Sequence, residues 1–130
     1  MDREGDNEMT QDFAKDKPIY LQLVERICGE IIKGHLKVGE KMPSVREYAI
    51  ESGVNVNTVQ RVYKELETMG ITETKRGQGT FITEEQVRIE QLREEMKETL
   101  AQQFLQAIES LGFTKQEMLS MLMRKGDAEC

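Results

Sequence analysis

Apolar residues recur at steps of three and four along the first half of the chain and predict three amphipathic helices. The expected helices cover residues 18–34, 44–51 and 55–69. Ser44 stands three residues before Glu47, which is the spacing of a capping box, and a glycine follows each segment as a helix stop. The pattern therefore predicts a group of short helices that share one core.

Polar and apolar residues alternate over residues 71–74 and again over residues 80–83, as expected of two short strands. The connecting residues 75–79 read Lys-Arg-Gly-Gln-Gly, a flexible basic turn. Two helices that are joined at Gly53 and followed by a basic hairpin form the sequence pattern of a winged helix-turn-helix. Residues 17–83 are therefore expected to be a domain that binds duplex DNA.

A longer helical pattern begins at Glu84 and ends at Gly112, and a second capping box opens a short helix at Thr114. A helical hairpin with one apolar stripe cannot bury that stripe alone. Residues 84–130 therefore need either the DNA-binding domain or a second copy of the chain to cover the stripe; the second option makes them a dimerisation region, with an effector site as a further option. The expected interface positions are Leu92, Met96, Leu100, Phe104, Ile108, Leu119 and Leu122.

The predicted fold class is mainly α with a small β-hairpin, an N-terminal winged helix-turn-helix followed by a C-terminal two-helix dimerisation hairpin. Charge divides the chain in the same way. Residues 1–16 carry a net charge of −4 and are expected to be a flexible acidic terminus, residues 17–83 carry +2, and residues 84–130 carry −4. The segment expected to meet phosphate is the only positive one, and its acidic flanks limit non-specific attraction to DNA.

Candidate DNA-contacting side chains lie opposite the apolar stripes or on the basic turn. Gln60 can pair with adenine and Arg61 with guanine or phosphate, near the end of the helix that enters a major groove. Arg46 points away from the apolar face of the preceding helix, where the alternative is a salt bridge with Glu47 or Glu51. The set derived in this way is Arg46, Asn57, Thr58, Gln60, Arg61, Lys64, Lys75, Arg76, Gly77, Gln78 and Gly79.

Other chemistries lack the residues that they need. His35 is the single histidine and no cysteine cluster exists, so neither a metal site nor a cofactor is expected. Cys28 lies in an apolar helical pattern and Cys130 ends the chain, which is typical of free thiols in a reducing cytoplasm. The sequence contains no recognisable pair of nucleophile and general base, so an enzyme is not expected. No apolar stretch approaches the ~20 residues that a membrane span needs.

Three stretches carry a resemblance to a known family. They read Pro-Ile-Tyr-Leu-Gln at 18–22, Gly-Glu-Lys-Met-Pro-Ser-Val-Arg-Glu at 39–47 and Gly-Gln-Gly-Thr-Phe at 77–81. In these the sequence resembles the GntR family of bacterial transcription regulators, although Met42 and Val56 stand where that family commonly has leucine and proline. The resemblance implies that Ser44, Asn55 and Thr80 also contact DNA.

The short tail looks like that of the YtrA-type subfamily, by its length and by Leu-Gly-Phe-Thr at 111–114. That likeness implies a homodimer held by the tail helices, repressing its own operon, often beside transporter genes.

The overall prediction is a cytoplasmic, homodimeric transcription regulator, a repressor that binds a palindromic operator. The alternative is a winged-helix protein-interaction module without direct DNA binding, which is supported only by the acidic flanks and the net charge of −6. Any small-molecule effector is expected at the dimer interface or near Glu84, because so short a tail leaves little room for an enclosed pocket. The methionines at 96, 118, 121 and 123 line such a pocket or belong to plain helix–helix core.

Overall fold

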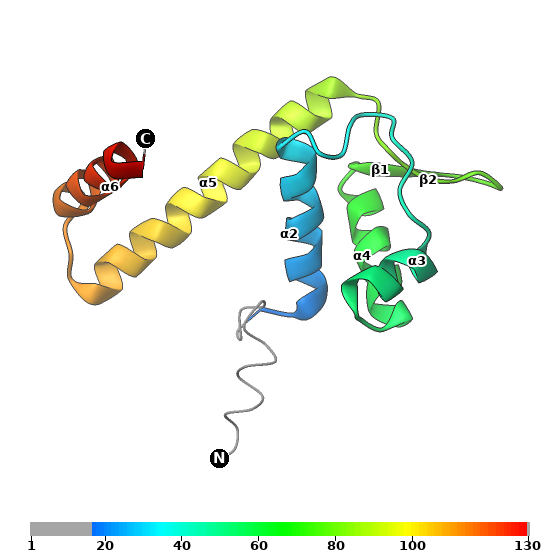
Figure 1. Ribbon diagram of the computed structural model, residues 1–130, viewed down its shortest axis with the longest axis horizontal. Coiled ribbons are helices and arrows are strands. Elements are labelled where there is room, and N and C mark those ends of the chain that lie inside the picture. Colours follow the sequence, from blue (N-terminus) through cyan, green and yellow to red (C-terminus); the bar gives the residue numbers. More distant parts are fainter. Residues whose placement is uncertain (1–16, 130) are drawn as a thin grey trace, which may run out of the picture. The chain divides into compact units, whose positions relative to one another are not determined.

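The computed structural model describes residues 17–129, with side chains described for residues 17–126. The expectations for residues 1–16 and for Cys130 lie outside the described residues. In chain order the elements are α2 (Ile19–Ile32), α3 (Val45–Ser52), α4 (Val56–Thr68), β1 (Thr72–Lys75), β2 (Gly79–Ile82), α5 (Gln86–Leu111) and α6 (Lys115–Glu129) (Figure 1). The predicted fold class, mainly helical with a small β-hairpin, is confirmed.

The core of the first unit forms where α4 packs against α2 on one side and α3 on another. Leu23 of α2 and Val59 and Leu66 of α4 are each 0% exposed, as their helical spacing predicts. Full burial of such a side chain contributes ~1.5–3 kcal/mol. Met42, which stands at the family's leucine position, is 4% exposed and fills the same core.

Local signals in the sequence fix the ends of α3 and α4. The Ser44 hydroxyl accepts a hydrogen bond from the Glu47 amide at 3.1 Å, and the Ser44 amide donates to the Glu47 carboxylate at 2.9 Å. Gly53 ends α3 with a φ of 71°, a conformation that costs glycine little. The side-chain oxygen of Asn55 then accepts from the Asn57 amide at 2.7 Å and caps α4.

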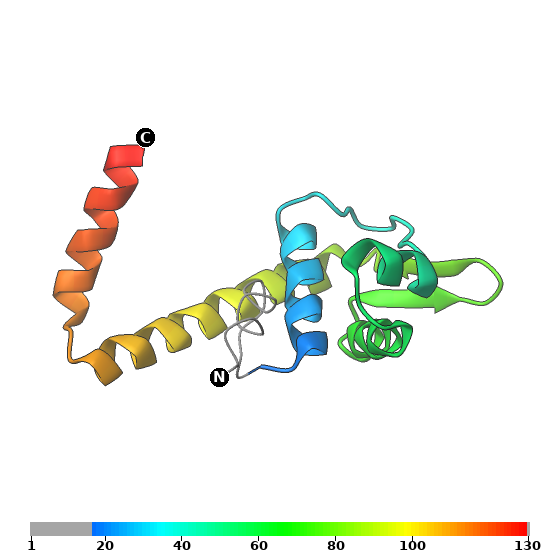
Figure 2. The ribbon, with the colours of Figure 1, turned by 60° about the horizontal axis from the view of Figure 1, so that its bottom comes forward.

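The hairpin pairs β1 with β2 in an antiparallel register that places Thr72 opposite Ile82. Lys41 forms an isolated bridge with Phe81, so the segment before α3 lies along the outer edge of β2. The Met42 amide donates to the Thr80 carbonyl at 2.7 Å on this edge. The hairpin extends beyond α3 and α4, as Figure 2 shows, and is anchored at its base by the buried side chain of Ile82.

The chain divides into two compact units inside α5, between Glu90 and Gln91. The first turn of α5 belongs to the first unit because the Arg88 guanidinium donates to the Met69 carbonyl at 2.9 Å and Ile89 is 8% exposed. The sequence placed the boundary at Glu84, where the helical pattern begins. Packing of the first unit continues past that residue.

The second unit contains the rest of α5 together with α6. The predicted capping box at Thr114 is present: its hydroxyl accepts from the Glu117 amide at 3.1 Å, and its amide donates to the Glu117 carboxylate at 2.7 Å. The turn between α5 and α6 is stabilised by a hydrogen bond from the Phe113 amide to the Ile108 carbonyl at 3.0 Å. The long helix thus ends at Leu111, just before the predicted stop at Gly112, and α6 begins after its predicted cap at Thr114, while α5 begins at Gln86, two residues after the predicted start at Glu84.

Candidate nucleic-acid interface

The exposed face of α4 is the centre of the candidate interface. Its opposite face is buried through Val59, Val62 and Leu66, each 0% exposed. The face away from the core presents Asn57, Gln60, Arg61 and Lys64, all exposed, together with half-buried Thr58. Because α3 precedes α4 across a tight turn at Gly53, the two helices have the arrangement of a helix-turn-helix (Figures 1 and 2).

Arg46 lies in the first turn of α3 and is exposed. Among the described residues, neither Glu47 nor Glu51 forms an ion pair with Arg46. The Glu47 carboxylate instead accepts a hydrogen bond from the Ser44 amide. The salt-bridge alternative is therefore absent, and the guanidinium is available to an external partner. Ser44 accepts a cap bond through its oxygen but keeps its hydroxyl hydrogen as a donor.

Arg61 is held by a residue that the sequence reading did not single out as a site residue. Its guanidinium lies 3.8 Å from the centre of the Tyr20 ring, a cation–π contact between α4 and the first turn of α2. These two side chains, with Asn57 and Thr58, line a shallow hollow of about 450 Å³. The sequence shows only an aromatic residue two positions after Pro18, and nothing in the local pattern identifies Arg61 as its partner.

The hairpin tip supplies a second exposed basic group. Lys75, Arg76, Gly77, Gln78 and Gly79 are exposed, and Thr80 is half-buried. The Lys75 ammonium lies 4.9 Å from the centre of the Phe81 ring, which supports the side chain over the strand.

Gly79 adopts a backbone conformation that favours glycine, with a φ of 119°. A Cβ at that position would lie 2.9 Å from Cε of Lys41, near the end of a flexible, exposed side chain that can shift. The backbone conformation, rather than this contact, is therefore what requires glycine. Lys41 was not predicted, because its approach to residue 79 depends on the edge bridge to Phe81.

A shallow groove of about 470 Å³ separates α4 from the hairpin and is lined in part by Gln60, Lys64 and Thr80. Tyr63 lies at its base and donates its hydroxyl to the Pro43 carbonyl at 2.7 Å. Burial raises the pKa of Tyr63 far above its usual value, so the phenol keeps this proton. The bond links α4 to the segment that leads into α3.

The sequence-predicted DNA-contacting residues all lie in the first unit, on α3, α4, their caps and the hairpin tip. Asn55 is the most constrained because its side-chain oxygen already caps α4 at 2.7 Å, which leaves its amide N–H₂ for a further partner. Most of the others have side chains exposed to solvent. The exposed members are Ser44, Arg46, Asn55, Asn57, Gln60, Arg61, Lys64, Lys75, Arg76, Gly77, Gln78 and Gly79.

The predicted dimer positions fall into two groups. Leu92 and Ile108 are only 2% and 5% exposed in a single chain, so they have little surface left for a partner. Met96 is half-buried. The side chains that remain open are Leu100 (65% exposed), Phe104 (39%), Leu119 (61%) and Leu122 (49%).

Other kinds of site find little support in the part of the chain that the structure describes. Residues 17–129 contain no group of three or more His, Cys, Asp or Glu side chains able to hold a metal ion. No helix over the same residues is both long and apolar enough to cross a membrane. The Cys28 side chain is buried, 2% exposed, as predicted.

A helix-turn-helix with an exposed polar face and a basic hairpin defines a winged-helix DNA-binding protein. The family model described as "Bacterial regulatory proteins, gntR family" matches residues 19–82. The HTH-type transcriptional regulator YhcF of Bacillus subtilis is 44% identical over 111 residues, covering 85% of this chain and 92% of YhcF. The chain belongs to the GntR family, and it is a DNA-binding transcription regulator.

Two further comparisons place the chain within that family. The HTH-type transcriptional repressor YtrA of Bacillus subtilis is 48% identical over 73 residues, which cover 56% of each chain. A solved GntR family transcriptional regulator from Listeria monocytogenes is 39% identical with a TM-score of 0.78, and the match covers 86% of this chain and 98% of that one. The likeness therefore includes the helical tail as well as the winged helix.

Proposed function

We propose that two copies of this chain pair through their tails and repress transcription by binding a palindromic operator. In this proposal each copy places α4 in a major groove, with Arg46 at the groove edge and the hairpin tip against the adjacent backbone or minor groove. A two-fold symmetric protein favours half-sites about one DNA turn, ~10 bp, or a multiple of it apart.

The observation that carries the DNA-reading part is the position of Gln60, Arg61 and Lys64. All three are exposed on one face of α4, whose other face is fully buried. Gln60 suits adenine, Arg61 suits guanine or phosphate, and Lys64 suits phosphate, so the face combines base reading with backbone binding. No competing role within the described chain occupies Gln60 or Lys64.

Pairing through the tail is supported by the apolar surface that the second unit leaves open. In addition to four predicted interface residues, this unit exposes Leu111 (69%), Phe113 (48%), Met121 (42%) and Met123 (66%). Large apolar side chains left exposed in such number on one unit favour an interaction site there. A second copy is the proposed partner because a palindromic site requires two identical reading units.

The direction of regulation is proposed from a relative. YtrA of Bacillus subtilis is named as a repressor and matches this chain over 73 residues. We therefore propose repression, in the cytoplasm where the chromosome lies, and an operator close to the regulator's own operon, with transporter genes as a candidate target. A small-molecule effector would relieve the repression.

The test is selection of a preferred site from random duplex DNA by the full chain. The expected product is an inverted repeat, and the same selection with Gln60→Ala should yield an altered base preference at one position in each half-site. Affinity for the selected site should fall steeply with salt, because phosphate contacts release counterions. No enriched site, or binding that is insensitive to salt, would instead support a winged helix that contacts proteins alone.

A further inference from the structure

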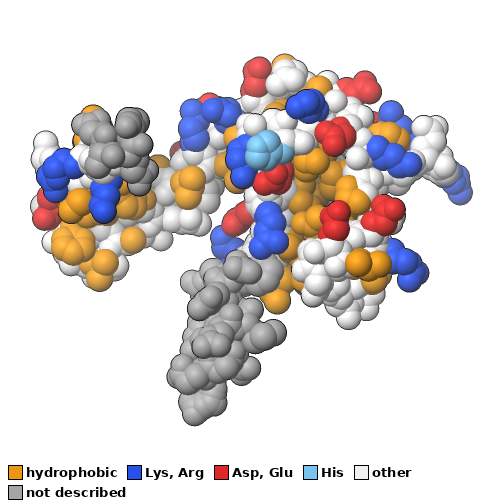
Figure 3. Space-filling view, in the orientation of Figure 1, with side chains coloured by type: hydrophobic (Ala, Val, Ile, Leu, Met, Phe, Trp, Pro, Cys, Tyr) orange, Lys and Arg blue, Asp and Glu red, His pale blue; other side chains and the backbone are white. Residues whose placement is uncertain are grey.

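A hollow of about 440 Å³ opens in the winged-helix unit between α2, α3 and the loop that joins them. Its floor is apolar, with Ile27 (3% exposed) and Met42 (4% exposed) beside Leu36 and Tyr48. Figure 3 shows orange apolar surface in the region between these helices, flanked by acidic and basic side chains. The hollow lies apart from the α4 face and the hairpin tip, so DNA binding as proposed above does not use it.

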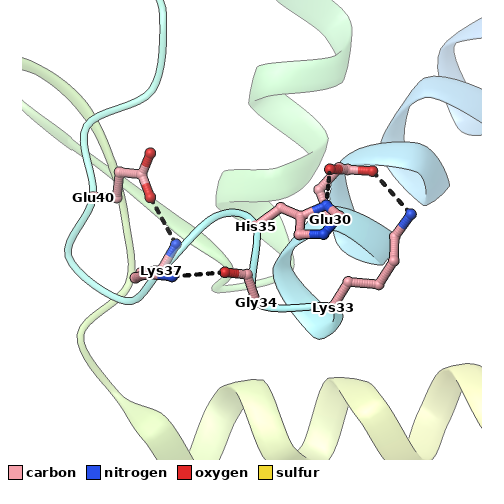
Figure 4. A network of polar contacts seen from close by, with 6 residues as sticks. All are labelled: Glu30, Lys33, Gly34, His35, Lys37 and Glu40. Atoms are coloured by element: carbon pink, nitrogen blue, oxygen red, sulfur yellow. Dashed lines mark hydrogen bonds and ion pairs between the residues drawn. The ribbon is translucent and has the colours of Figure 1, made fainter.

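The charged groups around the hollow are Arg26, Glu30, His35 and Glu51. Glu30 is already engaged, since its carboxylate binds the His35 ring nitrogen at 2.9 Å and the Lys33 ammonium at 3.2 Å (Figure 4). Those contacts lower the pKa of Glu30, so it remains ionised. Glu51 has no ion pair or hydrogen bond to the residues that the structure describes, so its exposed carboxylate is open to a ligand, while the positive charge of Arg26 stands at the same hollow.

The loop that forms one wall of this hollow is held in a defined shape. The Lys37 ammonium donates to the Gly34 carbonyl at 2.9 Å, and the Lys37 amide donates to the Glu40 carboxylate at 2.8 Å (Figure 4). Together with the bond between Glu30 and His35, these contacts fix the first part of the loop, up to Glu40. A preformed wall favours ligand binding because little ordering remains to be done.

The same wall contacts the DNA-reading elements on its other side. Met42 and Pro43 both line the hollow. The Met42 amide binds the Thr80 carbonyl of the hairpin at 2.7 Å, and the Pro43 carbonyl accepts from the Tyr63 hydroxyl of α4 at 2.7 Å. These two hydrogen bonds connect the wall of the hollow directly to the hairpin and to α4.

We propose that this hollow binds a small organic cation with an apolar or aromatic body, and that the bound cation changes operator affinity. The Glu51 carboxylate pairs with the positive group, the Tyr48 ring faces it, and the apolar body covers Ile27 and Met42. The coupling runs through the backbone bonds of Met42 and Pro43. This site is distinct from the interface between copies and from the region near Glu84, where the sequence reading placed an effector.

The test uses the full chain and three probes of matched shape: 2-phenylethylamine, 2-phenylethanol and phenylacetate. Amide chemical shifts are followed without DNA, so the outcome does not depend on whether the operator has been identified. The amine should perturb residues around Ile27, Leu36 and Tyr48 in a saturable manner, and the other two probes should bind more weakly. Equal binding of the alcohol, or no saturable shift with the amine, overturns the proposal.

Glu51→Gln should weaken the amine about tenfold, which corresponds to one charge-assisted hydrogen bond. Glu109→Gln is the matched control, since Glu109 is an exposed carboxylate on α5, and it should leave the affinity unchanged. Both variants should keep the circular dichroism of the parent. An affinity that is the same in Glu51→Gln as in the parent rules out Glu51 as the anchor, and unchanged operator affinity at saturating amine rules out the coupling.

Discussion

The guanidinium of Arg61 lies over the ring of Tyr20, 3.8 Å from its centre, and this contact joins the candidate recognition helix to the first turn of α2. The contact restricts where the Arg61 side chain can point before DNA arrives. An arginine that is already oriented loses less conformational entropy on binding than a free one. Tyr20 is therefore a positioning residue for the proposed reading face.

Tyr20→Ala is expected to weaken operator binding about three- to fivefold, because an exposed cation–π contact contributes ~0.5–1 kcal/mol. Tyr20→Phe keeps the ring and should bind nearly as tightly as the parent. Fluorescence anisotropy with labelled operator at one fixed salt concentration measures both. If phenylalanine fails to restore affinity, the hydroxyl of Tyr20 contacts DNA itself and the positioning role is wrong.

Arg46→Ala is expected to lower operator affinity about tenfold or more, since loss of a specific arginine contact costs ~1–3 kcal/mol. Arg46 is exposed and has no ion pair in the described chain, so thermal stability should stay within about 0.5 kcal/mol of the parent. Lys97→Ala removes a surface ion pair with Glu94 at 3.0 Å on α5 and serves as the control. Equal affinities for the two variants would remove Arg46 from the interface.

Leu100→Lys is expected to convert the proposed dimer into monomers. Leu100 is 65% exposed in a single chain, so the charge leaves the protomer's own core intact and acts only on a partner. Operator affinity should fall as the dimer dissociates, because each monomer then binds a single half-site without help from a linked second copy. Light scattering reports the mass, and Gln102→Lys on the polar side of α5 is the matched control. A Leu100→Lys dimer of undiminished stability would show that the interface lies elsewhere.

Tyr63→Phe is expected to cost about 1 kcal/mol of unfolding free energy, because the Pro43 carbonyl loses its 2.7 Å donor. Burial raises the pKa of Tyr63, so the folded state keeps a proton that the unfolded state releases above about pH 10. The stabilisation is therefore full below that pH and is lost as the pH rises beyond it.

Urea unfolding of both proteins at about pH 8 and about pH 10.5 measures this effect. The parent should lose more stability than Tyr63→Phe over that interval, so the difference between the two proteins should shrink. Burial also raises the pKa of Tyr48, which is present in both proteins and lies 6.1 Å from Tyr63 between ring centres, so Tyr48→Phe in each background is the control for its contribution. A difference that is constant with pH would contradict the buried, protonated Tyr63.

Features set by neighbours in the sequence could be predicted from it. Ser44 and Glu47 form the capping box that their spacing indicates, Asn55 caps α4, and Gly53 makes the turn between the helices. Each depends on residues no more than three positions apart, so the local chemistry decides the outcome. The sequence also predicted which side of α4 is exposed, because that side lies opposite the apolar stripe.

Contacts between distant segments could not be predicted in the same way. Tyr20 meets Arg61, and Lys41 meets Phe81, across separations of about forty residues in the sequence. Neither residue carries a local pattern that names its partner. Periodicity likewise places Ile108 and Leu100 on one apolar stripe, but only packing decides that Ile108 is buried within the chain while Leu100 stays open.

The most direct test of the central claim compares the selected operator with the same DNA in which one half-site has been scrambled, at a single salt concentration. A dimer that reads a palindrome places two reading units on two half-sites. Scrambling one half-site should therefore lower affinity by about a hundredfold or more, because several mismatches at ~1–3 kcal/mol each remove one unit's specific contacts. Equal affinity for the intact and scrambled sites would contradict a dimer that reads a palindrome.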